Sequence, residues 1–142
     1  MSKEFDDCLK RRRITEFERA KDLVQKELDS ADSDLKSAKD SFKDKSFKWS
    51  IIQSYYSMFH SARALIYSKG YRERSHYCLI VAIRKLFVDE GLLSYTLVEA
   101  LQLGKTLREN ADYYGEFSEE SAKQMIENAE EFLKTAQELT GK

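Results

Sequence analysis

The chain contains no proline in 142 residues, and this absence constrains its fold more than any other feature. Proline breaks helices and is common in turns, and glycine, the other frequent interrupter of regular structure, occurs only 5 times. Charged residues make up 35% of the chain, which suits the solvent-facing sides of helices. The composition therefore favours a few long helices over a sheet with many turns.

Apolar residues recur at steps of three and four along most of the sequence, as they do on one face of a helix. The first stripe predicts a long helix from a capping box at Thr15–Glu18 to about Phe42. Later stripes predict helices over residues 47–69, 75–90, 94–114 and 118–139, each preceded by a serine cap. No strand pattern is found. The predicted fold is all-α, an up-and-down bundle of four long helices plus one shorter helix.

We expect a single helical domain over residues 1–142, in which residues 1–12 form a polar, frayed N-terminal segment. The stretch from Phe47 to Gly91 holds the only Trp and both His, and it should supply two core helices. Three large side chains from different helices are expected to be buried in the core: Phe59, Leu86 and Phe132.

The sequence shows neither a membrane-spanning apolar run nor an apolar signal core at its N-terminus, so the predicted location is cytoplasmic. Cys8 and Cys78 lack the CxxC spacing of metal sites, and we expect neither a metal site nor a disulfide from them. Cys78 lies in an apolar run and is interpreted as a small buried hydrophobic residue. No motif indicates a metal or a cofactor.

Charge is distributed unevenly although the net charge is only -1, a value that gives no overall indication of nucleic-acid binding. Residues 109–142 carry nine acidic residues against three lysines. The densest basic cluster is Lys10–Arg13. It can be either a solvated N-terminal segment or an arm that contacts phosphate.

Polar residues interrupt the apolar stretch at regular positions. Tyr56, His60 and Arg63 form one row at spacings i, i+4 and i+7 on the second predicted helix. The row can hold a phosphate or a base, or it can be a hydrogen-bonded seam between helices or subunits. His76 follows two arginines at a helix start, where an anion can bind, or it belongs to a surface loop.

The other dense polar motif ends the fourth predicted helix and contains Arg108, Asn110, Asp112 and Tyr113. Arg108 and Asp112 are four residues apart, so they can simply form an ion pair on the helix surface. The same group also suits contact with a phosphate or a nucleotide.

Several segments together resemble the HEPN family, in particular small stand-alone HEPN proteins that pair with minimal nucleotidyltransferases. The matching segments are Ser54–Leu65, Gly70, Ser75–His76, Leu107–Tyr113, Ser118–Ala122 and Asn128–Leu133. The resemblance implies a helical bundle that usually dimerises. It also implies kinship with metal-independent ribonucleases, whose signature is Arg, four to six residues, then His, with Arg stabilising phosphate charge and His acting as acid or base.

This sequence departs from that signature, because the positions that should hold His after Arg108 are Tyr113, Tyr114 and Gly115. A tyrosine with its ordinary pKa of about 10 is a poor base at neutral pH. The resemblance therefore implies a dimeric binding component of a toxin–antitoxin-like module, with a minimal nucleotidyltransferase as partner and RNA or a nucleotide as ligand.

Two alternatives stay open. One is a ribonuclease toxin with a non-standard site, in which His60 or His76 replaces the missing His. The other is a purely structural protein-interaction module. If the bundle topology of the family holds, the Arg108 group and the row of His60 and Arg63 should meet in one cleft near a dimer axis.

Overall fold

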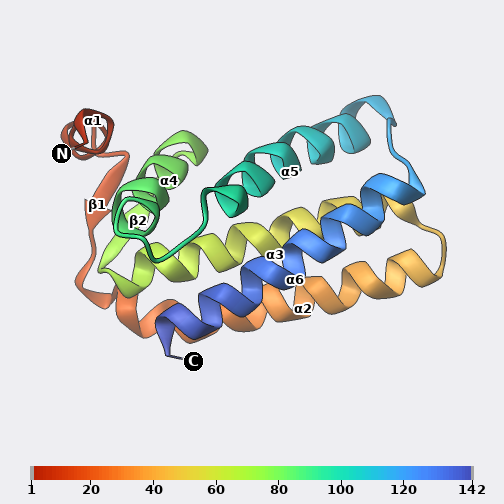
Figure 1. Cartoon of the computed structure of the whole chain (residues 1–142), viewed down its shortest axis with the longest axis horizontal. Coiled ribbons are helices and arrows are strands. Elements are labelled where there is room, and N and C mark those ends of the chain that lie inside the picture. Colours follow the sequence, from red (N-terminus) through yellow and green to blue (C-terminus); the bar gives the residue numbers. More distant parts are fainter. Residues whose placement is uncertain (1, 142) are drawn as a thin grey trace.

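The computed structural model describes residues 2–141 and shows long helices packed side by side, which confirms the predicted helical bundle (Figure 1). In chain order the elements are α1 (Lys3–Lys10), β1 (Ile14–Glu16), the 3-10 helix η1 (Glu18–Leu23), α2 (Val24–Lys43), α3 (Phe47–Ser68), β2 (Tyr71–Glu73), α4 (His76–Ile83), the π-helical turn η2 (Arg84–Val88), α5 (Tyr95–Tyr114) and α6 (Glu119–Thr140). The helices α2, α3, α5 and α6 form the bundle, and α1, β1, β2 and α4 gather at one end (Figure 1).

Helix α3 lies at the centre of the bundle, in contact with α2, α5 and α6. Its side toward α2 is lined with small buried residues, and two serine hydroxyls bond across to α2. Ser50 Oγ donates to the Ala38 carbonyl at 2.9 Å, and Ser57 Oγ donates to the Ala31 carbonyl at 2.8 Å. Both alanines are fully buried. The small side chains let the two helices approach closely, and the hydrogen bonds satisfy hydroxyls that burial would otherwise leave without partners.

The buried core agrees only in part with the expected residues. Phe132 of α6 is fully buried, as predicted. Phe59 and Leu86 are only partly buried, so the prediction for these two was wrong. Phe59 lies at a polar edge of α3. The guanidinium carbon of Arg63 is 5.3 Å from the centroid of the Phe59 ring. Leu86 lies in the π-helical turn, which disturbs the 3.6-residue spacing, so that Phe87 is buried instead.

Three of the predicted serine caps are confirmed. Ser75 Oγ accepts from the Cys78 amide at 3.1 Å, Ser94 Oγ from the Thr96 amide at 3.2 Å, and Ser118 Oγ from the Ser121 amide at 3.0 Å. Ser46 occupies the cap position of α3 but makes no hydrogen bond with its side chain. Gly115 ends α5 with a φ of 65°, the left-handed conformation that glycine adopts at low cost.

The first predicted helix begins later than expected, because its capping box is absent. Thr15 instead lies in β1, which pairs antiparallel with β2 and places Thr15 opposite Arg72. The pairing continues on both sides, since the Phe17 amide bonds the Gly70 carbonyl and the Arg74 amide bonds the Arg13 carbonyl. Burial of Ile14 and these backbone bonds outweigh the local capping signal, so the α-helix starts only at Val24.

The N-terminal segment is helical rather than frayed, and it is attached to the bundle. Ser2 caps α1 by accepting from the Phe5 amide at 3.1 Å, and Phe5 and Cys8 are buried one turn apart. Cys8 forms a disulfide with Cys78 of α4, across a sequence separation of 70 residues. The expectation of no disulfide was therefore wrong, since the packing of α1 against α4 brings the two Cα atoms to 5.9 Å.

We predict that the disulfide contributes about 2–4 kcal/mol to the free energy of unfolding, because it closes a long loop and so restricts the unfolded chain. Chemical denaturation of the oxidised protein should be compared with that of the reduced protein and of the Cys8→Ser/Cys78→Ser variant. The last two should have the same lowered midpoint. An unchanged midpoint after complete reduction would contradict the prediction.

Candidate functional site

Arg108, in the second half of α5, is held by aromatic and acidic side chains. Its Nη2 donates to the Tyr56 hydroxyl of α3 at 3.0 Å and lies 3.5 Å from Asp112 Oδ2. The guanidinium carbon is 5.5 Å from the ring centroid of Tyr56 and 5.7 Å from that of Tyr113. The ion pair expected between Arg108 and Asp112 is thus present, and it coexists with contacts across the bundle.

These neighbours favour the charged form of Arg108. Burial alone would lower its pKa, but the neighbouring Tyr56, Tyr113 and Asp112 outweigh burial and raise the pKa. The side chain is 20% exposed, and its buried Nε has no hydrogen-bond partner. Arg108 is therefore a positioned cation that remains open to solvent on one side, which suits an anionic ligand.

Gly104, one turn before Arg108, lies where α5 packs on α3. A Cβ atom at this position would lie 2.8 Å from Cε of Met58 and 3.5 Å from the Tyr55 ring. The glycine therefore leaves room for the end of the Met58 side chain between the two helices. This packing brings the Arg108 side chain within reach of Tyr56.

His76 extends the aromatic surround from α4. Its ring stacks on Tyr55 with centroids 6.2 Å apart, and Tyr55 lies 5.3 Å from the Tyr56 ring. Burial, followed by the charge of Lys105, lowers the pKa of His76, and its Nε2 is buried without a partner. Burial, followed by the effect of Tyr56, raises the pKa of Tyr55 to about 12. His76, Tyr55, Tyr56 and Arg108 thus form one chain of contacts across α4, α3 and α5.

The other half of the predicted row turns toward α2 and β2. His60 Nδ1 lies 3.3 Å from Glu27 Oε1, and its Nε2 lies 3.7 Å from Asp34 Oδ2. Arg63 Nε donates to Glu73 Oε1 at 3.2 Å, and its Nη1 lies 3.4 Å from Glu27. Within the row, Tyr56 contacts Arg108, whereas His60 and Arg63 contact carboxylates.

Of the three carboxylates in this cluster, Glu27 and Glu73 are buried, whereas Asp34 is partly exposed. Burial raises the pKa of Glu73 although Arg63 opposes the shift, and burial likewise raises the pKa of Asp34 against the effect of His60. The partly buried Arg63 lies between the buried carboxylates of Glu27 and Glu73 in a structural ion-pair network, where removal of one partner would leave a buried charge unpaired. The interpretation of His60 and Arg63 as a polar seam between helices therefore fits their contacts.

Asn110 has a backbone role at the end of α5. Its carbonyl accepts from the amides of Gly115 and Glu116, which closes the helix just after Tyr113 and Tyr114. The side chain of Asn110 is half-buried. The residue thus helps to position the helix end that carries Tyr113, 65% of whose surface is exposed.

Residues 2–141 offer neither a metal centre nor a membrane-spanning helix. No group of three or more His, Cys, Asp or Glu side chains in this range could hold a metal ion. In the same part of the chain, every helix is too short or too polar to cross a membrane.

Sequence reasoning missed Tyr55 and Gly104 as parts of the site. Tyr55 lies in the apolar part of the second predicted helix, and its contacts with both His76 and Tyr56 depend on which helix packs opposite. The adjacent pair Tyr55–Tyr56 could have indicated this role, because neighbouring helix positions point in different directions. One tyrosine can point into the core while the next lies at its edge. Gly104 gave a weaker signal, because a glycine in the middle of a predicted helix often marks a close helix contact.

Comparison with known proteins places the bundle in one family. The sequence profile of the HEPN domain matches residues 24–139, a range that begins at the first residue of α2 and ends within α6. The protein named "Putative toxin MJ0605" from Methanocaldococcus jannaschii is 31% identical over 111 residues, which are 78% of this chain and 83% of that protein. "Putative toxin MJ0142" from the same organism is 25% identical over 127 residues, which are 87% of this chain and 86% of that protein.

We predict that His76 titrates below its ordinary value of 6.5, since protonation would place a charge in a buried site near Lys105. The unfolded chain then takes up the proton first, so the folded state loses stability as pH falls below 6.5. In His76→Gln this particular loss should disappear. Histidine ring NMR titration, with thermal melts of both proteins between about pH 7 and pH 5, checks the prediction. An identical decline in both proteins would contradict it.

Proposed function

Because the chain belongs to the HEPN family, we propose that it is the dimeric binding component of a toxin–antitoxin-like module. Its partner in the proposal is a minimal nucleotidyltransferase, and its ligand is RNA or a nucleotide, bound through phosphate at Arg108. Two relatives that the chain covers over most of their length carry the name "Putative toxin", which supports a role in such a module.

The observation that carries the proposal is the fixed position of Arg108. A guanidinium has five N–H donors, and the contacts with Tyr56 and Asp112 both use Nη2. Donors therefore remain for a phosphate, and the flanking rings of Tyr56 and Tyr113 can stack on a base. Because Tyr56 holds the side chain, little conformational freedom is lost when a ligand binds.

The positions of the two histidines favour binding over cleavage. A ribonuclease of this family uses a His beside its Arg as acid or base, whereas the corresponding positions here are Tyr113, Tyr114 and Gly115. His60 is engaged by Glu27 and Asp34. The ring of His76 packs on Tyr55, and its Nε2 is buried without a hydrogen-bond partner. Within the described subunit neither imidazole is placed to exchange a proton with a phosphate held at Arg108.

Exposed aromatic and aliphatic side chains on α5 and the loop after it support the proposed dimer. Tyr113, Tyr114, Phe117 and Leu103 are each at least 49% exposed. Large apolar side chains grouped on one part of a surface are typical of protein contacts. Tyr113 contacts Arg108, so a second copy of the chain that covered Tyr113 would lie beside the Arg108 site.

We predict that the protein sediments at about twice the monomer mass of 16.6 kDa at micromolar concentration. Tyr114→Glu/Phe117→Glu should shift the population toward the monomer, because each change places a charge on surface that the dimer would bury. As a matched control, Glu119→Gln/Glu120→Gln alters charge at the neighbouring start of α6. A wild-type protein that sediments only as a monomer would exclude the dimer.

For the ligand site, we predict that Arg108→Ala weakens binding of ATP or an oligonucleotide about 10- to 100-fold, since a charge-assisted contact contributes about 1.5–3 kcal/mol. Isothermal titration at fixed salt, beside thermal melts, measures both affinity and stability. Arg19→Ala removes an equally charged, exposed side chain outside the site and serves as the control. If Arg108 is structural only, Arg108→Ala will lower the melting temperature and leave ligand affinity intact.

A further inference from the structure

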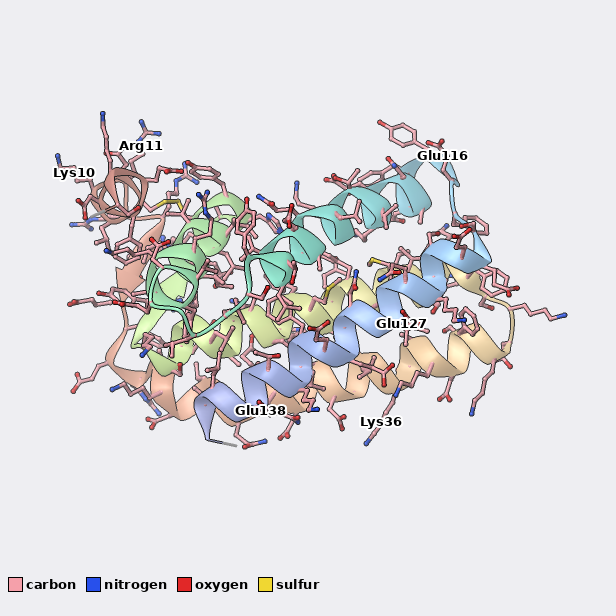
Figure 2. All side chains as sticks on the ribbon, in the orientation of Figure 1. Lys10, Arg11, Lys36, Glu116, Glu127 and Glu138 are labelled. Carbon is pink, nitrogen blue, oxygen red and sulfur yellow. A yellow bond between two sulfur atoms is a disulfide. The ribbon has the colours of Figure 1, made fainter. Side chains whose placement is uncertain are left out.

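A second basic surface lies at the end of the molecule that holds α1. Four consecutive basic residues, Lys10–Arg13, follow the last turn of α1. The Arg74 amide donates to the Arg13 carbonyl at 2.8 Å, so the end of β2 adds another arginine beside them. We call Lys10, Arg11, Arg12, Arg13 and Arg74 the basic corner. Figure 2 shows the Lys10 and Arg11 side chains extending from this corner of the molecule.

The cations of the basic corner differ in their surroundings from Arg63 and Arg108. All five are exposed, and among residues 2–141 none of them has a carboxylate within 4.0 Å. Arg63 and Arg108 by contrast are held in ion pairs. Five cations without close counterions repel one another, and an anionic partner would relieve that repulsion.

The backbone holds this cluster in a fixed shape. Arg12 has a φ of 57°, a left-handed conformation that a glycine would adopt at lower cost. The disulfide at Cys8 fixes the chain on one side of Arg12, and the pairing of β1 with β2 fixes it on the other. The basic corner is therefore a positioned surface and not a loose tail.

An aromatic side chain borders the corner. A surface hollow of about 400 Å³ is lined by Arg11, Arg13, Ser75 and Tyr77, together with the acidic residues Glu4 and Asp7. Tyr77 is 61% exposed, and its hydroxyl donates to Glu4 at 3.3 Å. Cations beside an exposed aromatic ring occur on surfaces that bind single-stranded nucleic acid, in which phosphates meet the cations and a base stacks on the ring.

The basic corner is connected to the Arg108 site through neighbouring residues, but the two surfaces use different side chains. Arg74 is two residues before His76, whose ring belongs to the chain of contacts leading to Arg108. The segment Lys10–Arg13 lies outside residues 24–139, the range that matches the HEPN domain. The corner thus lies largely outside the part of the chain that matches the family.

From these observations we propose that the basic corner docks the phosphate backbone of single-stranded RNA. The choice of RNA rests on the proposed function, whereas the cations and Tyr77 support a single-stranded polyanion independently of it. A strand held at the corner would be retained by several phosphates, while Arg108 binds a single phosphate or nucleotide.

The test compares two variants with equal changes of charge. Arg11→Gln/Arg13→Gln/Arg74→Gln neutralises the corner, and Lys43→Gln/Lys45→Gln/Lys123→Gln neutralises three exposed lysines elsewhere. Binding of a fluorescent 15-nucleotide oligouridylate is measured by anisotropy from about 50 to 300 mM salt. The corner variant should lose about 100-fold in affinity near 0.1 M salt, with a salt slope lower by about 2, since each lost phosphate contact contributes about 0.7. The control should stay within about 3-fold.

Three results would overturn the proposal. The first is an equal salt slope in both variants, and the second is a wild-type protein that does not bind the oligouridylate. The third is displacement of the RNA by polyglutamate as effectively as by unlabelled RNA of equal charge, which would indicate an acidic protein partner. ATP titration separates the two sites, because the corner variant should bind ATP like wild type while Arg108→Ala should not. If one of the two proposed sites does not bind its ligand, binding at the other can still be measured.

Discussion

The close contact of α2 with α3 is the interaction on which the rest of the structure depends. Fully buried alanines and serines bring the two backbones together, and the hydroxyls of Ser50 and Ser57 bond directly to α2 carbonyls. This contact occupies one side of α3 and leaves its other sides for α5 and α6. The direction in which Tyr55 and Tyr56 leave α3 follows from that arrangement, and so does the position of Arg108.

The long helices could be predicted because their signals are local. Apolar periodicity and the caps Ser75, Ser94 and Ser118 depend only on nearby residues, and all three caps form. The pairing of β1 with β2 and the bond from Cys8 to Cys78 join segments about 60 to 70 residues apart, for which a single sequence gives no register. Thr15 shows the competition directly, since its local capping pattern is overridden by a distant strand.

The sequence could predict most of the residues that belong to the candidate site, but not which of them contact one another. Spacing placed Tyr56, His60 and Arg63 in one row, yet the helix that packs opposite each residue decides its partner. Tyr56 faces Arg108 of α5, whereas His60 and Arg63 face carboxylates from α2 and β2. Periodicity specifies which side of a helix a residue occupies, and tertiary packing decides whether its neighbour is a cation, an acid or solvent.

The bond between Cys8 and Cys78 has a topological consequence for the covalent chain. It closes a ring that contains both α2 and α3, while α5 and α6 lie outside it. The exposed turn at Lys43–Ser46, where Lys45 has a φ of 62°, lies within this ring. A protease that cut there would open the ring without dividing the molecule, and the two fragments would separate only after reduction. The two helices of the central contact are thus linked by two covalent routes, one through the turn and one through sulfur.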